Sequence, residues 1–259
     1  MTTSTDLHDG WRVNSIATPR EAFVSCALDE LLADVVDRNT DKFDCMPVLS
    51  GDGTILGLVE LMAYFDETPP KGTVSEFLVT LGERHLIGAD ASILAFVVNA
   101  DEHRFRFVVS QRGIVGLVSL SDLQKLAVRA TLFSLVTELE LLMLQTIRRF
   151  LPQPADWQRL LHKNRRMKIA ELLDKAAAAD GVVDALLYTQ FCDKRDILLK
   201  SSLIAREHRD RFSLNMRAIE DLRNAVAHAN EYADTSAKAA EISRIAREVI
   251  AMGDLLKTL

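Results

Sequence analysis

Three residues near the C-terminal end of the chain carry side chains suited to acid–base chemistry. Arg223, Asn224 and His228 lie within the segment 222–230, which is otherwise rich in alanine. An imidazole can take up or release a proton at a reacting group. A guanidinium can hold the negative charge that builds up on a reacting centre. The group is therefore suited to moving protons while negative charge is stabilised.

A helical conformation of this segment determines how the three side chains are arranged. Asn224 and His228 are four residues apart and share one face, so the amide is close enough to orient the imidazole. Arg223 lies about 140° around the helix axis from His228 and must reach around it. One chain supplies a single imidazole and a single guanidinium, whereas a two-fold dimer with facing helices supplies two of each.

The motif resembles that of the HEPN family, which consists of all-helical domains, many of them metal-independent endoribonucleases. In that family an Arg is followed by four to six residues and then a His, and a polar residue, often Asn, follows the Arg; Arg223, Asn224 and His228 match each position. About 1.5 such spacings are expected by chance in a chain of this composition, so the spacing alone does not identify the family. The Asn that follows the Arg and the helical context are the features that support the match. The resemblance implies cleavage of RNA by its 2′-hydroxyl to a 2′,3′-cyclic phosphate, at a composite site between two protomers, with no catalytic cofactor.

An internal repeat in the first half supplies a second group of candidate residues. Segment 43–59 returns about 60 residues later as segment 105–118, each with two short apolar runs joined by a Gly-containing turn. Helical patterns precede and follow each copy, which predicts two units of strand, helix, hairpin and helix. This arrangement resembles the CBS domain, which occurs as a tandem pair, over roughly residues 11 to 128.

Ser119 and Asp122 in the second copy match the nucleotide signature of that family. The hydroxyl would meet a phosphate, and the carboxylate would accept both ribose hydroxyls. The first copy has Glu60 and Ala63 at these positions, so its site is predicted to be degenerate. The resemblance thus implies one regulatory adenine nucleotide, AMP or ATP. The alternative for Ser119 and Asp122 is a helix N-cap with an acid in the first turn, which stabilises by about 1 kcal/mol and needs no ligand.

The charge of the chain is unevenly distributed. The overall value of −6 excludes a protein that binds nucleic acid through the positive field of the whole chain. Residues 1–130 carry −8 and residues 131–259 carry +2, while the segment 148–168 alone carries +6. Five residues of this basic segment are candidates for RNA binding; they are Arg159, Lys163, Arg165, Arg166 and Lys168. The alternative is a solvated helix face.

These patterns predict an α+β chain in which a pair of CBS-like α/β repeats is followed by an all-α, HEPN-like helical bundle. The predicted parts are a disordered tail at 1–10, repeat 1 at 11–68, repeat 2 at 69–130 and the helical domain at 131–259. Neither Gly nor Pro occurs between Ser121 and Phe150, so this stretch is either one unbroken helix or two helices with a bend near Ala130. Pro152 and Pro154 end it.

Further helices are expected at Met167–Ala178, Val182–Lys200, Ser213–Tyr232 and Ser236–Leu256. In the second of these, Asp193, Lys194 and Arg195 interrupt an apolar pattern. They either line the same cleft as the motif or are solvated, and solvated charges are the commoner case.

The cysteines and the N-terminus point to a cytoplasmic protein. Cys26, Cys45 and Cys192 stand far apart, which excludes the close pairs of zinc sites and redox motifs and predicts reduced thiols. The N-terminus lacks the basic and apolar regions of a secretory signal. No apolar run approaches the roughly 18 residues needed to span a bilayer. We therefore expect neither a metal site nor a membrane partner.

Two functions remain open at this point. The first is a homodimeric HEPN-type endoribonuclease whose CBS-like pair senses an adenine nucleotide; RNA processing, a growth-arresting toxin and defence against phage are all compatible settings. The second is a non-catalytic, nucleotide-responsive adaptor whose helical half dimerises or docks a partner protein.

Overall fold

The computed structural model describes residues 10–178, 184–228, 232–233 and 235–259, and these form two compact units. The sheet unit comprises 13–91 and 103–119. The helical unit comprises residues 10–12, residues 92–102 and the described residues from 120 to 259. The predicted disordered tail falls almost entirely on residues 1–9, which lie outside the described residues.

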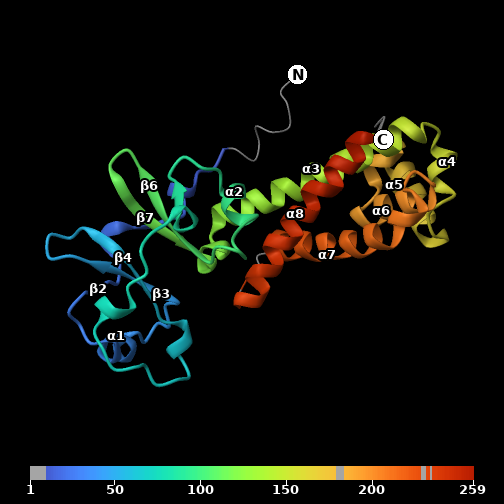
Figure 1. Cartoon of the computed structure of the whole chain (residues 1–259). Coiled ribbons are helices and arrows are strands. Elements are labelled where there is room, and N and C mark those ends of the chain that lie inside the picture. The colour runs from blue at the N-terminus through green and yellow to red at the C-terminus, as the bar shows by residue number, and fades with distance from the viewer. Residues whose placement is uncertain (1–9, 179–183, 229–231, 234) are drawn as a thin grey trace. The chain divides into compact units, whose positions relative to one another are not determined.

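The sheet unit contains two small sheets, both visible in Figure 1. The first has the strand order β2-β3-β4, with β2 (Cys26–Ala27) parallel to β3 (Cys45–Leu49) and β3 antiparallel to β4 (Ile55–Glu60). Helix α1 (Leu32–Arg38) connects β2 to β3. Its apolar residues Leu32 and Val35 are buried in one cluster with Met46 and Val48 of β3.

The second sheet repeats this pattern and adds one strand. Strand β5 (Leu86–Gly88) is parallel to β6 (Phe105–Ser110), and β6 is antiparallel to β7 (Gly113–Ser119). Strand β1 (Thr18–Pro19) pairs with the free edge of β7, so a segment from the range predicted for repeat 1 lies in the sheet of repeat 2.

The two hairpins have the same register, which confirms the internal repeat. Val48 faces Gly57 in the first hairpin and Val108 faces Gly116 in the second, and a bulge follows the valine in both. The equivalent glycines admit a neighbouring backbone. A Cβ atom on Gly116 would lie 2.8 Å from the carbonyl oxygen of Thr18, and one on Gly57 would meet that of Val79.

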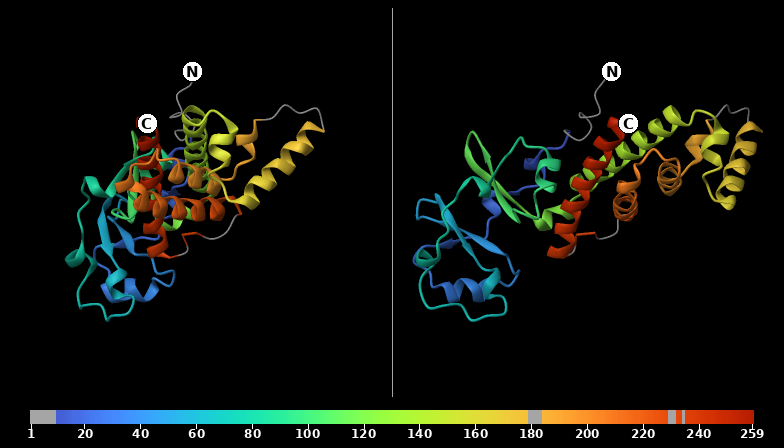
Figure 2. Two further views of the ribbon diagram at one scale, coloured as in Figure 1. Left: turned by 90° about the vertical axis from the view of Figure 1, so that its right-hand side faces the viewer. Right: turned by 45° about the vertical axis from the view of Figure 1, so that its right-hand side comes forward.

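The helical unit is built around one long helix. It contains α2 (Ile93–Val97), α3 (Leu126–Phe150), α4 (Pro154–Gln158), α5 (Lys163–Ala177), α6 (Phe191–Lys200), α7 (Arg209–Ala227) and α8 (Ser236–Thr258). Helix α3 contacts α6, α7 and α8, and it runs beside α8 in Figures 1 and 2. No strand follows Ser119 in the described part of the chain, so the predicted helical character of this region is confirmed.

Helix α3 forms because 25 residues without Gly or Pro place apolar side chains on one face. Leu132, Leu139 and Met143 are fully or almost fully buried on that face. Neither of the two expected forms is found, because α3 runs through Ala130 as one helix but does not begin at Ser121. A 3₁₀ turn, η7 (Leu120–Gln124), comes first, and Lys125 is extended at φ −64° and ψ 146°.

Other helix boundaries differ from the expectations as well, since α5 begins at Lys163, not Met167, and α7 begins at Arg209, not Ser213. Helix α6 begins at Phe191, not near Val182, because Gln190 and Asp193 form a capping box at that point. Helix α7 ends at Ala227, with His228 as its C-cap, while residues 229–231 lie outside the described part of the chain. Among the described residues, no helix combines the length and the apolar character that crossing a bilayer demands.

Candidate functional site

The motif residues lie at the C-terminal end of α7, on a helix with one buried and one exposed face. Phe212, Met216 and Ile219 are buried, as are Leu222 and Val226. On one side, exposed positions recur every three or four residues; they are Leu214, Arg217, Asp221, Asn224 and His228. Asn224 is the last of these positions inside the helix, and His228 is its C-cap; both are exposed in a single chain.

Arg223 reaches around the helix toward this face, as the spacing requires. Its Nη1 donates a hydrogen bond to Oδ1 of Asn224 at 3.3 Å. The backbone N–H of His228 donates to the carbonyl oxygen of Asn224 at 3.1 Å. Within the described residues the Asn224 amide thus contacts the guanidinium, not the imidazole. His228 is the C-cap of α7, and its side chain is exposed at the helix end.

Two residues outside any motif belong to the contacts at this end of α7: Arg129 touches the helix itself, and the ring of Tyr232 lies against the Arg129 guanidinium. Arg129 of α3 bonds backbone carbonyls of the last turn of α7, and Tyr232 bonds the backbone of η7. Sequence reasoning did not find them, because Arg129 is 96 residues from Ala225 and no spacing rule relates the two.

The two candidate nucleotide residues lie on either side of the point where the chain passes from the sheet unit to the helical unit. Ser119 is the last residue of β7 and is half-buried. Asp122 lies in η7 and is only 4% exposed. Its Oδ1 forms a salt bridge with Nζ of Lys125, which is 2.7 Å away. The equivalent first-repeat residues, Glu60 at the end of β4 and Ala63 in the 3₁₀ turn η4 (Met62–Tyr64), are both exposed.

The basic segment divides into exposed and engaged residues. Arg159, Lys163, Arg166 and Lys168 are exposed, at or near the N-terminal half of α5. Arg165 is engaged in a two-pronged ion pair with Asp193: its Nε and Nη2 lie 2.9 and 2.6 Å from the carboxylate oxygens. These hydrogen bonds raise the pKa of Arg165.

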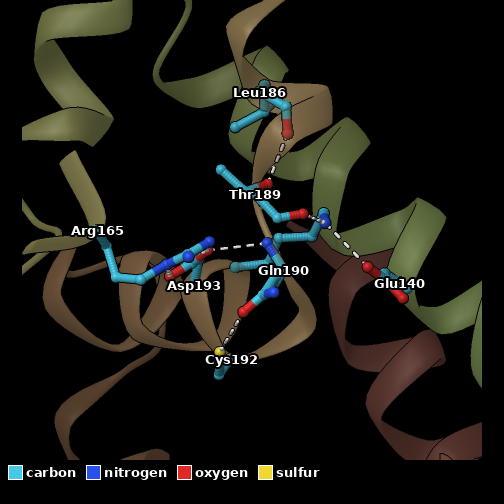
Figure 3. Close-up of polar contacts among 8 residues, drawn as sticks. Glu140, Arg165, Leu186, Thr189, Gln190, Cys192 and Asp193 are labelled. Carbon is cyan, nitrogen blue, oxygen red and sulfur yellow. Dashed lines mark hydrogen bonds and ion pairs between the residues drawn. The ribbon is translucent and has the colours of Figure 1, made fainter. Parts of the chain in front are cut away.

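Asp193 belongs to a polar network that joins α3, α5 and α6, shown in Figure 3. Its carboxylate also accepts the backbone N–H of Gln190 at 2.8 Å. The neighbouring Lys194 donates from Nζ to Glu140 at 2.9 Å and to the carbonyl oxygen of Thr189 at 2.7 Å.

The expectation of solvated charges at this point is wrong for two of the three residues. Asp193 and Lys194 are 4% and 3% exposed, because each meets opposite charge and backbone groups from other elements. Arg195 is partly buried and pairs with Glu220 of α7 at 2.7 Å. The interrupted apolar pattern was visible in the sequence, but it allows two outcomes, because charges that interrupt an apolar helix are either solvated or paired.

Comparison with known proteins gives matches only among solved structures. No family model and no curated protein matches the chain. The CBS domain of a bacterial CNNM/CorC family Mg²⁺ transporter in complex with ATP is 22% identical, with a TM-score of 0.38 over 49% of this chain and 92% of that one. CBSX2 in complex with AMP is 19% identical, with a TM-score of 0.35 over 48% and 97% of the two chains. A hemolysin-like, CBS-domain protein of Oenococcus oeni is 13% identical, with a TM-score of 0.35 over 46% and 92%.

Proposed function

We propose that this protein is a metal-independent endoribonuclease of the HEPN kind, active as a homodimer and regulated by an adenine nucleotide. The observation that carries the proposal is the arrangement at the end of α7. The Arg223 guanidinium reaches the exposed Asn224 side chain, one turn before the exposed imidazole of His228. A cation and a proton carrier are thus offered to solvent from the same end of one helix.

Cleavage by the 2′-hydroxyl requires a base for that proton, an acid for the leaving 5′-oxygen and a cation for the phosphate. One chain offers a single imidazole at this site, so the second proton carrier comes from a second copy. The exposed face of α7 is suited to this contact. Leu214 is 70% exposed, and a two-fold copy whose α7 runs parallel to this one brings the two Leu214 side chains together and the two His228 side chains together, with Arg217 diagonally opposite Asp221 of the copy.

Local basic residues hold the RNA in this proposal. Arg159, Lys163, Arg166 and Lys168 are exposed and are free of the ion pair that engages Arg165. Lys and Arg contacts to phosphates give weak, salt-dependent binding without sequence preference.

Regulation is assigned to Ser119 and Asp122. The equal hairpin registers of the two repeats support the family resemblance from which these roles come. Asp122 accepts two ribose hydroxyls in this proposal once the exposed Lys125 side chain has moved aside.

Labelled RNA incubated with the full-length chain tests the catalytic claim. We expect wild type to cleave it, and Arg223→Ala and His228→Ala to be at least 100-fold slower, as expected for a lost cation or proton carrier. His208→Ala, an exposed histidine at the opposite end of α7, is the matched control and should cleave normally. Equal rates for wild type and His228→Ala would refute the claim.

Sedimentation velocity tests the dimer. Leu214→Asp places a charge on the proposed interface and should give monomers that do not cleave RNA. Leu126→Asp, which changes a leucine that is 79% exposed on α3, should leave both properties unchanged. Dimeric Leu214→Asp protein would exclude this face of α7 as the interface.

Calorimetry with AMP and ATP tests the sensor. We expect wild type to bind at least one of the two and Asp122→Ala to bind neither, because the ribose loses its acceptor. Asp52→Ala, which removes an exposed acid in the first hairpin, is the control. Nucleotide binding without RNA cleavage would favour the adaptor function.

A further inference from the structure

Arg129 lies in the first turn of α3 and contacts the last turn of α7. Its Nη1 donates to the carbonyl oxygens of Ala225 at 3.0 Å and Val226 at 3.3 Å. The last carbonyls of a helix have no donor within the helix, and they form the negative end of its dipole. A guanidinium at this position therefore stabilises the turn that leads directly into His228.

Tyr232 connects the same region to η7. Its hydroxyl donates to the carbonyl oxygen of Leu123 at 2.5 Å, and its ring centre is 4.8 Å from the guanidinium carbon of Arg129. The side chain is buried, and burial raises the pKa of the phenol to about 12, so it stays protonated and able to donate. Leu123 is the residue that follows Asp122.

We propose that Arg129 and Tyr232 are positioning residues, which hold the last turn of α7, and with it His228, against η7. The proposal rests on the proposed function, in which His228 moves a proton during RNA cleavage. An imidazole on an exposed helix end has few contacts to fix its place, so a misplacement on the order of 1 Å would cost on the order of 100-fold in rate. The same contacts join the motif to the turn that carries Asp122.

Hydrogen exchange on the full-length chain tests the holding contacts without any need for RNA cleavage. In Arg129→Ala we expect the amides of residues 224–228 to exchange roughly tenfold faster than in wild type, because two carbonyls lose a charged donor. Arg129→Lys should recover part of the protection. Arg244→Ala, which removes an exposed ion pair on α8, is the control and should match wild type. Unchanged exchange at 224–228 in Arg129→Ala would overturn the proposal.

Steady-state kinetics test the positioning role. Arg129→Ala should lower kcat roughly 10- to 100-fold and leave KM for RNA within about twofold, because the residue touches no RNA. Arg129→Lys should restore part of kcat. If wild type cleaves RNA and Arg129→Ala cleaves it at the same rate, the positioning role is wrong. If wild type cleaves none, the proposed function fails, while the exchange result still decides whether Arg129 holds this turn.

Tyr232→Phe tests the connection to η7, because it removes the hydroxyl and keeps the ring beneath Arg129. The nucleotide that calorimetry shows to bind, AMP or ATP, should change exchange at residues 224–228 at least twofold in wild type and leave it unchanged in Tyr232→Phe. An equal effect in both proteins, or none in wild type with that nucleotide bound, would overturn the connection.

Discussion

Replacing Asp193 by Asn gives a direct measure of how strongly the buried network holds the helical unit together. The substitution keeps the shape of the side chain and an oxygen that can accept the Gln190 N–H, and it removes the charge that faces Arg165. Breaking a buried ion pair costs about 3–5 kcal/mol. The side chain of Arg165 is 28% exposed and can be partly rehydrated, so we expect a loss of about 2–3 kcal/mol.

The chain supplies a control that differs mainly in burial. Asp184 pairs with one arginine, Arg148, at 2.6 Å and accepts one backbone N–H, from Leu186. Its side chain is 43% exposed, so Asp184→Asn should cost less than about 1 kcal/mol. The free energy of unfolding is measured by urea denaturation followed by far-UV circular dichroism. In 0.5 M salt, charges in solvent are screened over a distance on the order of a few Å. The loss of unfolding free energy in Asp193→Asn should persist in this salt, because Asp193 is buried. Equal losses in the two variants would refute the assignment of Asp193 to a buried, stabilising pair.

Three further substitutions test other parts of the account. Burial lowers the pKa of His85, and its Nδ1 accepts the N–H of Gly82 at 2.9 Å. Protonation of His85 is therefore less favourable in the folded state than in the unfolded one. The contribution of His85 to the free energy of unfolding should be fully present above about pH 6.5, where the unfolded histidine is neutral, and should decline as the pH falls below that value. His85→Gln should reduce this decline in urea midpoints, and His208→Gln, at an exposed histidine, should not. Gly116→Val should destabilise by about 2–3 kcal/mol in urea unfolding, because its Cβ would lie 2.8 Å from the Thr18 carbonyl. Gly51→Ala, at a position with open space around it, should change stability by less than about 0.5 kcal/mol. Lys163→Gln combined with Arg166→Gln should raise KM for RNA and reduce its salt dependence, with kcat unchanged; an unchanged KM would exclude these residues from RNA binding.

Much of the fold could be predicted from local patterns. The two hairpins follow from apolar runs around a Gly-containing turn, and α3 follows from a long stretch without Gly or Pro. Helix ends were less predictable, because they depend on side-chain contacts such as the capping box of Gln190 and Asp193. The pairing of β1 with β7 was not predicted, because a strand of two residues has no periodicity. This pairing depends on the close approach of the Thr18 backbone to Gly116.

The candidate motif could be found from the sequence, whereas its surroundings could not. Arg223, Asn224 and His228 are close in the chain, so helix geometry alone relates them. Arg129 reaches the backbone of Ala225 and Val226, between the motif residues, through tertiary packing of α3 on α7, which no spacing in the sequence encodes. The burial of Asp193 and Lys194 also depends on partners from other elements.

Mapping of RNA ends in excess EDTA tests the central claim most directly. The full-length protein is incubated with 5′-labelled RNA, and the ends of the fragments are identified chemically. We predict 2′,3′-cyclic phosphate ends that form without divalent metal and that disappear in His228→Ala. Cleavage that requires a divalent metal, fragments with other ends, or the same products from His228→Ala would contradict the account.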